Sequence, residues 1–359
     1  MSDRAERVTA QFAQAGIDVL LVTDLVNVRY LTGYTGSNGL ALVGPQLRIF
    51  ISDFRYQEQA AEEVQDTFAR RIASAPQGLL DLVGEALPVG ELRLGYEADH
   101  VSVSQHQHLR TQLRDDVELA STTRLVETLR AVKEPNELAR IKAATALADA
   151  AFDRLLRERI VGRTERELAL ALENGMRQRG AERVSFETIV AGGPHGALPH
   201  AQPRDVEISD GDLVVIDWGA QLDGYCSDCT RTVAAGDPGS DARDVYELVL
   251  EAQLAGLQAV RAGRGGREVD GVARDVIASA GYAQRFGHGL GHGVGLEIHE
   301  RPTLSTRSDD ELRAGNVVTV EPGVYIPQQF GVRIEDLVVV ADDGCQILTS
   351  VPKQLVVVD

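Results

Sequence analysis

Residues 287–300 read GHGLGHGVGLEIHE, and glycine occupies every second position from 287 to 295. Glycine loses more backbone freedom on folding than any other residue, so such a run is costly unless the fold requires it. In an extended segment alternate residues face opposite sides, which predicts His288 and His292 on one face and the glycines on the other. A glycine face lets another backbone or a substrate approach closely. The spacing fits no GxGxxG phosphate loop, and we interpret His288, His292 and His299 as parts of a site.

The second half of the chain contains an internal repeat. GDLVVIDWG (211–219) aligns with GNVVTVEPG (315–323), with glycine at both ends and an acidic residue at the same position. Two helical patterns precede each copy, and each pattern is followed by a glycine: Gly162 and Gly180 in the first half, Gly263 and Gly281 in the second. Such a repeat predicts a domain with pseudo-two-fold symmetry and a site between its halves.

Each copy of the repeat predicts a pair of facing carboxylates. Folding the chain about QLDG (221–224) sets Asp217 opposite Asp228. A second fold-back near residue 328 sets Glu321 opposite Glu335. Opposed residues have Cβ atoms roughly 4.5–5.5 Å apart. Two carboxylates at this short distance in apolar surroundings need a proton or a cation to offset their charge. The two pairs therefore predict two divalent cations, with one neutral imidazole as a further ligand.

Charge and composition exclude several classes of partner. The chain has 54 acidic and 36 basic residues and a net charge of −18, which repels nucleic acid. The chain contains no apolar run of about 18 residues, so no membrane span is predicted. The charged N-terminal segment does not resemble a signal peptide, and we therefore expect a cytoplasmic protein. Three cysteines are too few for a disulfide framework, and we interpret Cys226 and Cys229 as buried apolar residues.

A change in pattern predicts two domains. Residues 1–128 alternate short apolar strands with helices, whereas 133–160 read as one long helix with Pro135 at its start. We place the boundary just ahead of that helix. The chain is therefore predicted to be α+β, with a smaller α/β domain over 1–128 and the repeat-containing domain over 129–359.

The motifs of the second domain resemble those of the "pita-bread" metallopeptidases. This group includes methionine aminopeptidases, Xaa-Pro aminopeptidases and prolidases, with creatinase as a metal-free relative. Its five metal ligands follow the order Asp, Asp, His, Glu, Glu, and the matching motifs here are IDWG, YCSDCTRT, GHGVG, TVEPG and RIED. The resemblance implies a pita-bread (creatinase/aminopeptidase-like) catalytic domain whose metal ligands are Asp217, Asp228, His292, Glu321 and Glu335.

The same resemblance implies how the ligands share two divalent ions. Asp217 and Glu335 would bridge the ions, Asp228 would bind one of them, and His292 and Glu321 would bind the other. An oxygen-rich shell with one imidazole suits Mn²⁺, with Zn²⁺ or Co²⁺ as alternatives.

Further site residues follow from the resemblance. Glu321 would also carry a proton to the leaving nitrogen. His288 and His299 would hydrogen-bond the substrate, and His200 would shape the proline side of the pocket. Tyr325 and Arg333 match positions that support the ligands. His195 departs from the family pattern and receives no role.

The N-terminal segments NVRYLTGYTGSNG (27–39) and SDFRYQEQA (52–60) resemble the creatinase-type domain of Xaa-Pro peptidases. The resemblance therefore covers nearly the whole chain and implies a homodimer acting on peptides with proline in second position. The short loop YTGSNG and the compact N-terminal domain of this chain resemble those of small bacterial Xaa-Pro aminopeptidases and favour that activity. The alternative is a prolidase (Xaa-Pro dipeptidase), which needs a loop closing the cleft or a cation for the proline carboxylate; candidates for the cation are Arg48, Arg55 and Arg301.

Two other readings fit less well. Metal-free hydrolysis of the creatinase kind conflicts with the presence of all five ligands. A non-catalytic pita-bread binding module would usually have lost metal residues, and this chain has not.

Overall fold

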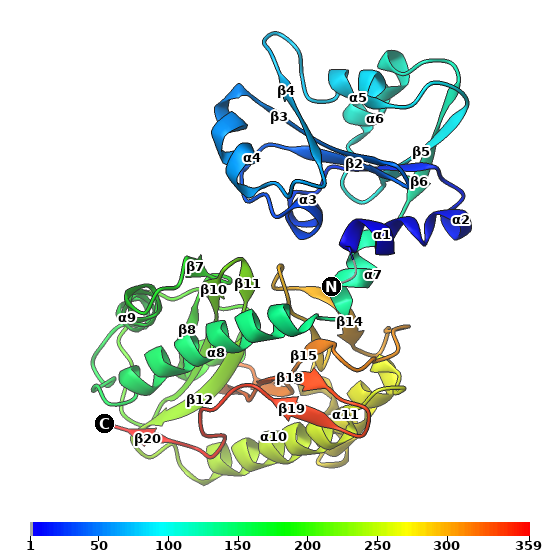
Figure 1. Cartoon of the computed structure of the whole chain (residues 1–359). Coiled ribbons are helices and arrows are strands. Elements are labelled where there is room, and N and C mark those ends of the chain that lie inside the picture. Colours follow the sequence, from blue (N-terminus) through cyan, green and yellow to red (C-terminus); the bar gives the residue numbers. More distant parts are fainter. Residues whose placement is uncertain (1–2) are drawn as a thin grey trace. The chain divides into compact units, whose positions relative to one another are not determined.

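Contacts divide the chain into two compact units, Met1–Arg130 and Ala131–Asp359 (Figure 1). The computed structural model describes residues 3–359. Within that range no helix combines the length and apolarity needed to cross a bilayer.

The first unit is built on a six-stranded sheet in the order β4-β3-β2-β1-β5-β6. Strand β2 is antiparallel to β1 and β3, and the other neighbours are parallel. Buried Leu, Ile and Val side chains of the sheet form a core with helices α5 and α6. The strands are β1 (Val19–Val22), β2 (Leu40–Gly44), β3 (Leu47–Asp53), β4 (Ala69–Ala73), β5 (Leu92–Glu97) and β6 (Val117–Thr122). The helices are α1 (Arg4–Thr9), α2 (Phe12–Ala15), α3 (Leu25–Thr32), η1 (Phe54–Tyr56), α4 (Gln57–Glu63), α5 (Asp81–Ala86), α6 (Val103–Gln112) and α7 (Leu125–Ala131).

The second unit has the two helix pairs that the repeat predicts. They are α8 (Pro135–Leu155) with α9 (Glu165–Gln178), and α10 (Ser240–Ala259) with α11 (Gly266–Ser279). Thr164 and Glu167 form the capping box that starts α9. Gly180 and Gly281 follow α9 and α11 with positive φ, the left-handed conformation that often ends a helix. Helices α8 and α10 end earlier than expected, at Leu155 and Ala259, so Gly162 and Gly263 lie in the loops beyond them.

Two sheets carry the two copies of the repeat. Their orders are β20-β12-β9-β8 and β14-β13-β15-β18-β19, and hairpins β9–β12 and β15–β18 lie within them. Smaller sheets are β11-β10-β7 and β16-β17. The bounds are β7 (Arg183–Val184), β8 (Ile189–Gly192), η2 (Gly193–Ala197), β9 (Leu213–Trp218), β10 (Ala220–Leu222), β11 (Tyr225–Cys226), β12 (Cys229–Ala235), η3 (Ala283–Arg285), β13 (Gly291–Gly293), β14 (Glu300–Leu304), β15 (Val317–Val320), β16 (Gly323–Ile326), β17 (Phe330–Arg333), β18 (Asp336–Val340), β19 (Cys345–Ile347) and β20 (Val357–Val358).

The predicted pairing of the first hairpin is wrong by two residues. Thr230, not Asp228, lies opposite Asp217. The turn consists of Asp223 and Gly224, both with positive φ, which is the tight two-residue turn that an Asp-Gly sequence favours over a longer loop. A shift of two residues leaves every side chain on its own face of the ladder. The shift therefore does not by itself turn Asp228 away from the face that carries Asp217.

The second fold-back has the predicted register. Val320 pairs with Asp336 and Gly323 with Arg333, which leaves Glu321 and Glu335 at matching positions between these pairs. Both glutamates lie just outside the regular strands.

The glycine-rich run is only partly extended. Strand β13 covers Gly291–Gly293, so the predicted strand through 287–295 is too long. The predicted close approach is present, because a Cβ on Gly291 would overlap the Thr319 carbonyl and one on Gly293 would overlap the Arg301 carbonyl. Glycine at these two positions lets β14 and β15 lie directly against β13.

Candidate metal centre

Five side chains from separate strands and strand ends meet in one cleft of the second unit. This cleft is a cavity of about 440 Å³, and its lining includes all five predicted metal ligands. The ligands come from the end of β9 (Asp217), the bend before β12 (Asp228), the middle of β13 (His292), the residue after β15 (Glu321) and the link between β17 and β18 (Glu335).

The carboxylates form a tight and partly unsatisfied cluster. Ligand atoms of Asp217, Asp228 and Glu335 lie within 4.8 Å of one another. His292 Nε2 is 3.5 Å from Asp228 Oδ2 and 3.3 Å from Glu321 Oε1. Asp217 Oδ1 and Glu335 Oε1 are buried without a hydrogen-bond partner. A buried carboxylate oxygen without a partner is strongly unfavourable, so these two oxygens fit the role of cation ligands.

The pKa values in this cluster report the same crowding. Burial, and then the neighbouring carboxylates, raise the pKa of Asp228 and of Glu335 well above the usual range. Burial would also raise the pKa of Glu321, but the hydrogen bond and charge of His292 outweigh it and hold that pKa at about 2. The cluster cannot carry all its negative charges without a counter-charge, and divalent cations bound by oxygen and imidazole would supply it.

Arg333 hydrogen-bonds one predicted ligand directly, and Tyr325 hydrogen-bonds Arg333. Arg333 Nη2 donates to Asp217 Oδ2 at 2.6 Å, and its Nη1 donates to Tyr325 Oη at 2.9 Å. Arg333 Nε donates to Thr230 Oγ1, which donates in turn to Glu335 Oε2 at 2.7 Å. One guanidinium therefore orients both carboxylates that have an unpartnered oxygen. Thr230 was not singled out from the sequence.

The predicted cleft histidines occupy different environments. His200 lies exposed at the cleft lining, and the ring of His299 lies 4.4 Å from that of His292. His288 uses both ring nitrogens within the chain, 2.8 Å from Gly289 O and 2.9 Å from Tyr325 Oη. Burial lowers the pKa of His288 and of His299, so both are neutral at pH 7.

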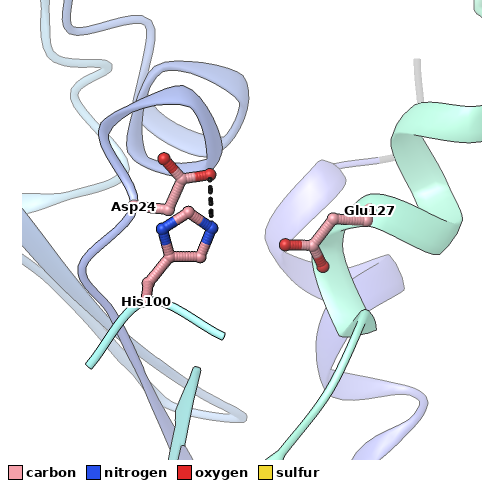
Figure 2. A group of neighbouring side chains, drawn as sticks. All are labelled: Asp24, His100 and Glu127. Atoms are coloured by element: carbon pink, nitrogen blue, oxygen red, sulfur yellow. Dashed lines mark ion pairs between the residues drawn. The ribbon is translucent and has the colours of Figure 1, made fainter. Parts of the chain in front are cut away.

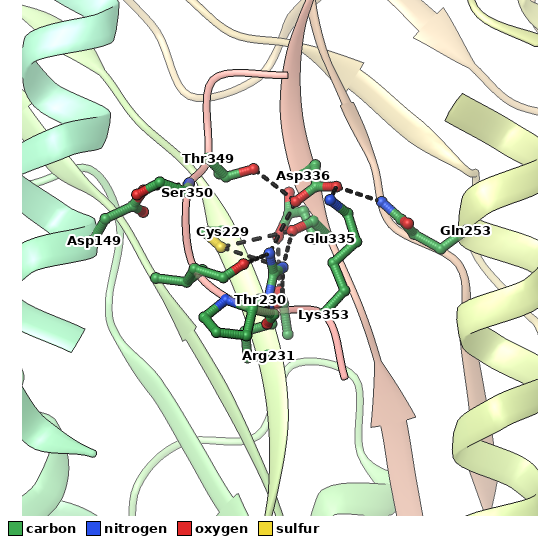
Figure 3. A network of polar contacts seen from close by, with 12 residues as sticks. Asp149, Cys229, Thr230, Arg231, Gln253, Glu335, Asp336, Thr349, Ser350 and Lys353 are labelled. Carbon is green, nitrogen blue, oxygen red and sulfur yellow. Dashed lines mark hydrogen bonds and ion pairs between the residues drawn. The ribbon is translucent and has the colours of Figure 1, made fainter. Parts of the chain in front are cut away.

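A buried polar network lies behind Glu335 (Figure 3). Arg231 Nη2 donates to Asp336 Oδ1 at 2.9 Å, and Arg231 Nη1 donates to the carbonyl of Glu335. Asp336 also accepts from Gln253, Thr349 and Lys353. The pair Arg231–Asp336 was not predicted from the sequence. Arg231 is a charged residue within the otherwise uncharged strand Cys229–Ala235, and that is the signal that could have revealed it.

Cys226 and Cys229 are buried thiols, as predicted. Burial raises the pKa of Cys226 to about 11 and that of Cys229 well above its usual value. Both therefore stay protonated at neutral pH, which does not suit a thiolate metal ligand or nucleophile.

A second group of ligand-type side chains lies in the first unit: Asp24, His100 and Glu127 (Figure 2). His100 Nε2 is 3.6 Å from Asp24 Oδ2, and Arg130 NH1 is 3.8 Å from the same oxygen. Asp24 also caps helix α3 by accepting from the amide of Val26. Since a guanidinium already supplies positive charge, we interpret this group as an ion-pair network at a helix start.

Comparison with known proteins agrees with this geometry. The model of metallopeptidase family M24 matches residues 139–342, and that of the creatinase/prolidase N-terminal domain matches residues 4–132. The chain is 36% identical to an Xaa-Pro dipeptidase of Pyrococcus furiosus, over 99% of this chain and 100% of the relative. Among solved structures, an Xaa-Pro dipeptidase from Bacillus anthracis is 41% identical with a TM-score of 0.94, covering 99% of both chains. An X-Pro aminopeptidase from Thermotoga maritima is 37% identical with a TM-score of 0.90, covering 99% of this chain and 100% of that one.

These matches confirm the predicted α+β architecture, with a creatinase-type domain ahead of a pita-bread domain. They also show that the chain is an enzyme, so the reading as a non-catalytic binding module is wrong. The chain belongs to metallopeptidase family M24 and carries the creatinase/prolidase N-terminal domain.

Proposed function

We propose that this peptidase is an Xaa-Pro dipeptidase that depends on two divalent cations. The observation that carries the proposal is the buried acidic cluster with its two unpartnered oxygens. The cluster lies in a cleft that is also lined by three histidines besides the predicted ligand His292, namely His200, His288 and His299. Relatives named Xaa-Pro dipeptidase support the substrate class. They favour the dipeptidase alternative over the aminopeptidase activity that the sequence first suggested.

Asp217, Asp228, His292, Glu321 and Glu335 would hold the cations, most suitably Mn²⁺. Divalent cations there would supply Lewis-acid polarisation of the scissile carbonyl and a nucleophile at neutral pH. The protein's own part is to hold the ligands in position, and Arg333 does this for Asp217 through a hydrogen bond. Burial raises the pKa of Asp217, and the positive charge of Arg333 opposes that rise. Glu321, with a pKa of about 2, is a carboxylate at pH 7 and can accept a proton and pass it to the leaving nitrogen.

The cleft histidines would bind the substrate. A neutral His299 can donate one N–H to an oxygen of the substrate as negative charge develops there. His288 would have to break its hydrogen bond with Tyr325 or Gly289 before it could bind the substrate. Its contacts therefore favour a role in positioning Tyr325 over direct contact with the substrate. His200 would line the side of the cleft that receives proline, whose nitrogen has no N–H to donate to a peptidase.

We also propose that the protein forms a homodimer.

One observation favours Xaa-Pro aminopeptidase as a second candidate. Among residues 3–359, Arg333 is the one arginine or lysine that lines the cleft, and it already binds Asp217 and Tyr325. The three arginines considered for the proline carboxylate all pair with acidic residues instead: Arg48 with Asp3, Arg55 with Asp53, and Arg301 with Asp309 and Asp310. Among the described residues, the lining of this cleft therefore offers no unpaired arginine or lysine that could bind the carboxylate of a C-terminal proline.

The choice between the two activities follows from one comparison of substrates. We expect the Mn²⁺-loaded protein to hydrolyse an Xaa-Pro dipeptide with a kcat/KM at least about tenfold above that for the tripeptide Xaa-Pro-Gly, since a tenfold preference needs only about 1.4 kcal/mol. Rates are measured by proline or Xaa release. An equal or faster rate on the tripeptide would assign the aminopeptidase activity, and absence of cleavage of both would reject an Xaa-Pro substrate.

Removing the cations is expected to destabilise the protein. The buried carboxylates would lose their counter-charge, and a ligand at about a hundred times its Kd stabilises a fold by about 2.7 kcal/mol. Thermal unfolding followed with and without EDTA measures this, and restoring Mn²⁺ after EDTA serves as the control. An unchanged Tm would contradict cation binding at the cluster.

A further inference from the structure

The segment 193–203 contributes one wall of the cleft through its second half. Pro199, His200, Ala201, Gln202 and Pro203 belong to the cavity lining. Apart from the short turn Gly193–Ala197, this segment has no regular secondary structure that would hold its shape. Its position must therefore come from contacts with other parts of the unit.

One carboxylate binds both ends of this segment. At the start, Glu165 accepts hydrogen bonds from the Gly192 amide at 3.1 Å and from His195 Nδ1 at 2.9 Å. At the end, it accepts from the amide of Arg204 at 2.9 Å and from that residue's Nε and NH2 at 3.1 Å each. Glu165 is only 1% exposed. Charge-assisted bonds to a buried carboxylate are among the strongest that a protein makes.

The other side of the segment contacts residues next to the candidate metal centre. Arg333 Nη1 donates to the Pro199 carbonyl at 3.0 Å, and the same guanidinium donates to Asp217. Gly196 lies against Gly331 of β17, where a Cβ on Gly331 would overlap the Gly196 carbonyl. The wall is thus fixed between the metal centre and Glu165, and Glu165 does not itself line the cleft.

We propose that Glu165, through His195 and Arg204, is the residue that positions the His200 wall of the cleft and thereby sets the affinity for the proline side of the substrate. This gives a role to His195, which the sequence left unassigned. The part about substrate affinity rests on the proposed Xaa-Pro peptidase function. Burial by itself would raise the pKa of Glu165, but the hydrogen bonds from Arg204, Gly192 and His195 outweigh it and lower that pKa, so the side chain is a carboxylate at neutral pH.

The test is Glu165→Gln, which keeps the shape of the side chain and removes its charge. We expect KM for an Xaa-Pro dipeptide, and the Ki of the product proline, to rise about tenfold with kcat changed less than about twofold, because the metal ligands are untouched. Arg204→Gln added to Glu165→Gln should raise KM little further, since the two residues act through one interaction. A general loss of stability would not produce this division between KM and kcat.

Glu167→Gln is the matched control. Glu167 lies in the same helical turn, but its carboxylate accepts from the Thr164 amide, and glutamine can replace glutamate in that capping box. This variant should keep the wild-type KM.

Hydrogen exchange separates this proposal from the proposed function. In Glu165→Gln the amides of residues 193–203 should exchange at least about tenfold faster than in the wild type, with or without peptide hydrolysis. Unchanged exchange there would overturn the proposal, even if the wild type cleaves no Xaa-Pro peptide. Faster exchange with an unchanged KM would also overturn it, because Glu165 would then hold the segment without affecting the substrate.

Discussion

Replacing Asp228 by alanine is expected to lower kcat/KM for an Xaa-Pro dipeptide about a thousandfold. Asp228 is buried, one of its oxygens lies within 4.8 Å of an oxygen of Asp217 and of Glu335, and its Oδ2 is 3.5 Å from His292 Nε2. Losing this ligand should weaken binding of one cation. Metal polarisation of a reacting carbonyl is worth several kcal/mol, and about 4 kcal/mol corresponds to a factor of about a thousand.

Two measurements check this expectation together. Steady-state kinetics give kcat/KM, and elemental analysis of the dialysed protein gives the metal content per chain. The matched control is Asp244→Ala, which removes an exposed carboxylate from α10 and should change neither quantity. Full activity with an unchanged metal content in Asp228→Ala would contradict the proposed metal centre.

Replacing Arg231 by leucine should have the largest effect on stability, a loss of about 3–5 kcal/mol in the free energy of unfolding. Its side chain is 2% exposed and pairs with Asp336, whose side chain is fully buried. It also donates to the carbonyls of Pro352 and Val351 at 2.7 and 2.9 Å. Leucine would leave Asp336 with less counter-charge and these carbonyls without their donor.

Urea unfolding followed by circular dichroism measures this change. Arg243→Leu is the matched control, because Arg243 makes a 3.0 Å ion pair with Asp237 on the surface, where both partners are largely exposed. A surface pair contributes at most about 1 kcal/mol. If the two variants lose the same small amount, the buried network does not stabilise the fold as we infer. Arg231→Leu should also reduce cation affinity, since Arg231 holds the main chain of Glu335.

The elements that follow local rules were predictable from the sequence. Pro135 and the Thr164 capping box place the starts of α8 and α9, because these signals act within one helical turn. The repeat predicted two equivalent halves, each with two helices and a hairpin. The five predicted acidic and histidine ligands were recognisable because each lies in a short motif, and the fold brings all five residues to one cleft.

The strand register was not predictable to the residue. Pairing Asp217 with Asp228 or with Thr230 keeps the same side chains on the same face, so the hydrophobic pattern cannot distinguish them. The positive φ angles of Asp223 and Gly224 decide between the two pairings. Only the folded chain shows that turn.

The sequence by itself determined the kind of scaffold and predicted which residues would bind cations and in which order. The tertiary structure decided how those residues are held. Arg231 lies 105 positions from Asp336, and Glu165 lies 39 positions from Arg204, so nothing local in the sequence links either pair. Buried charges take the partner that the fold brings within reach, and that choice depends on packing across the whole unit rather than on neighbouring residues.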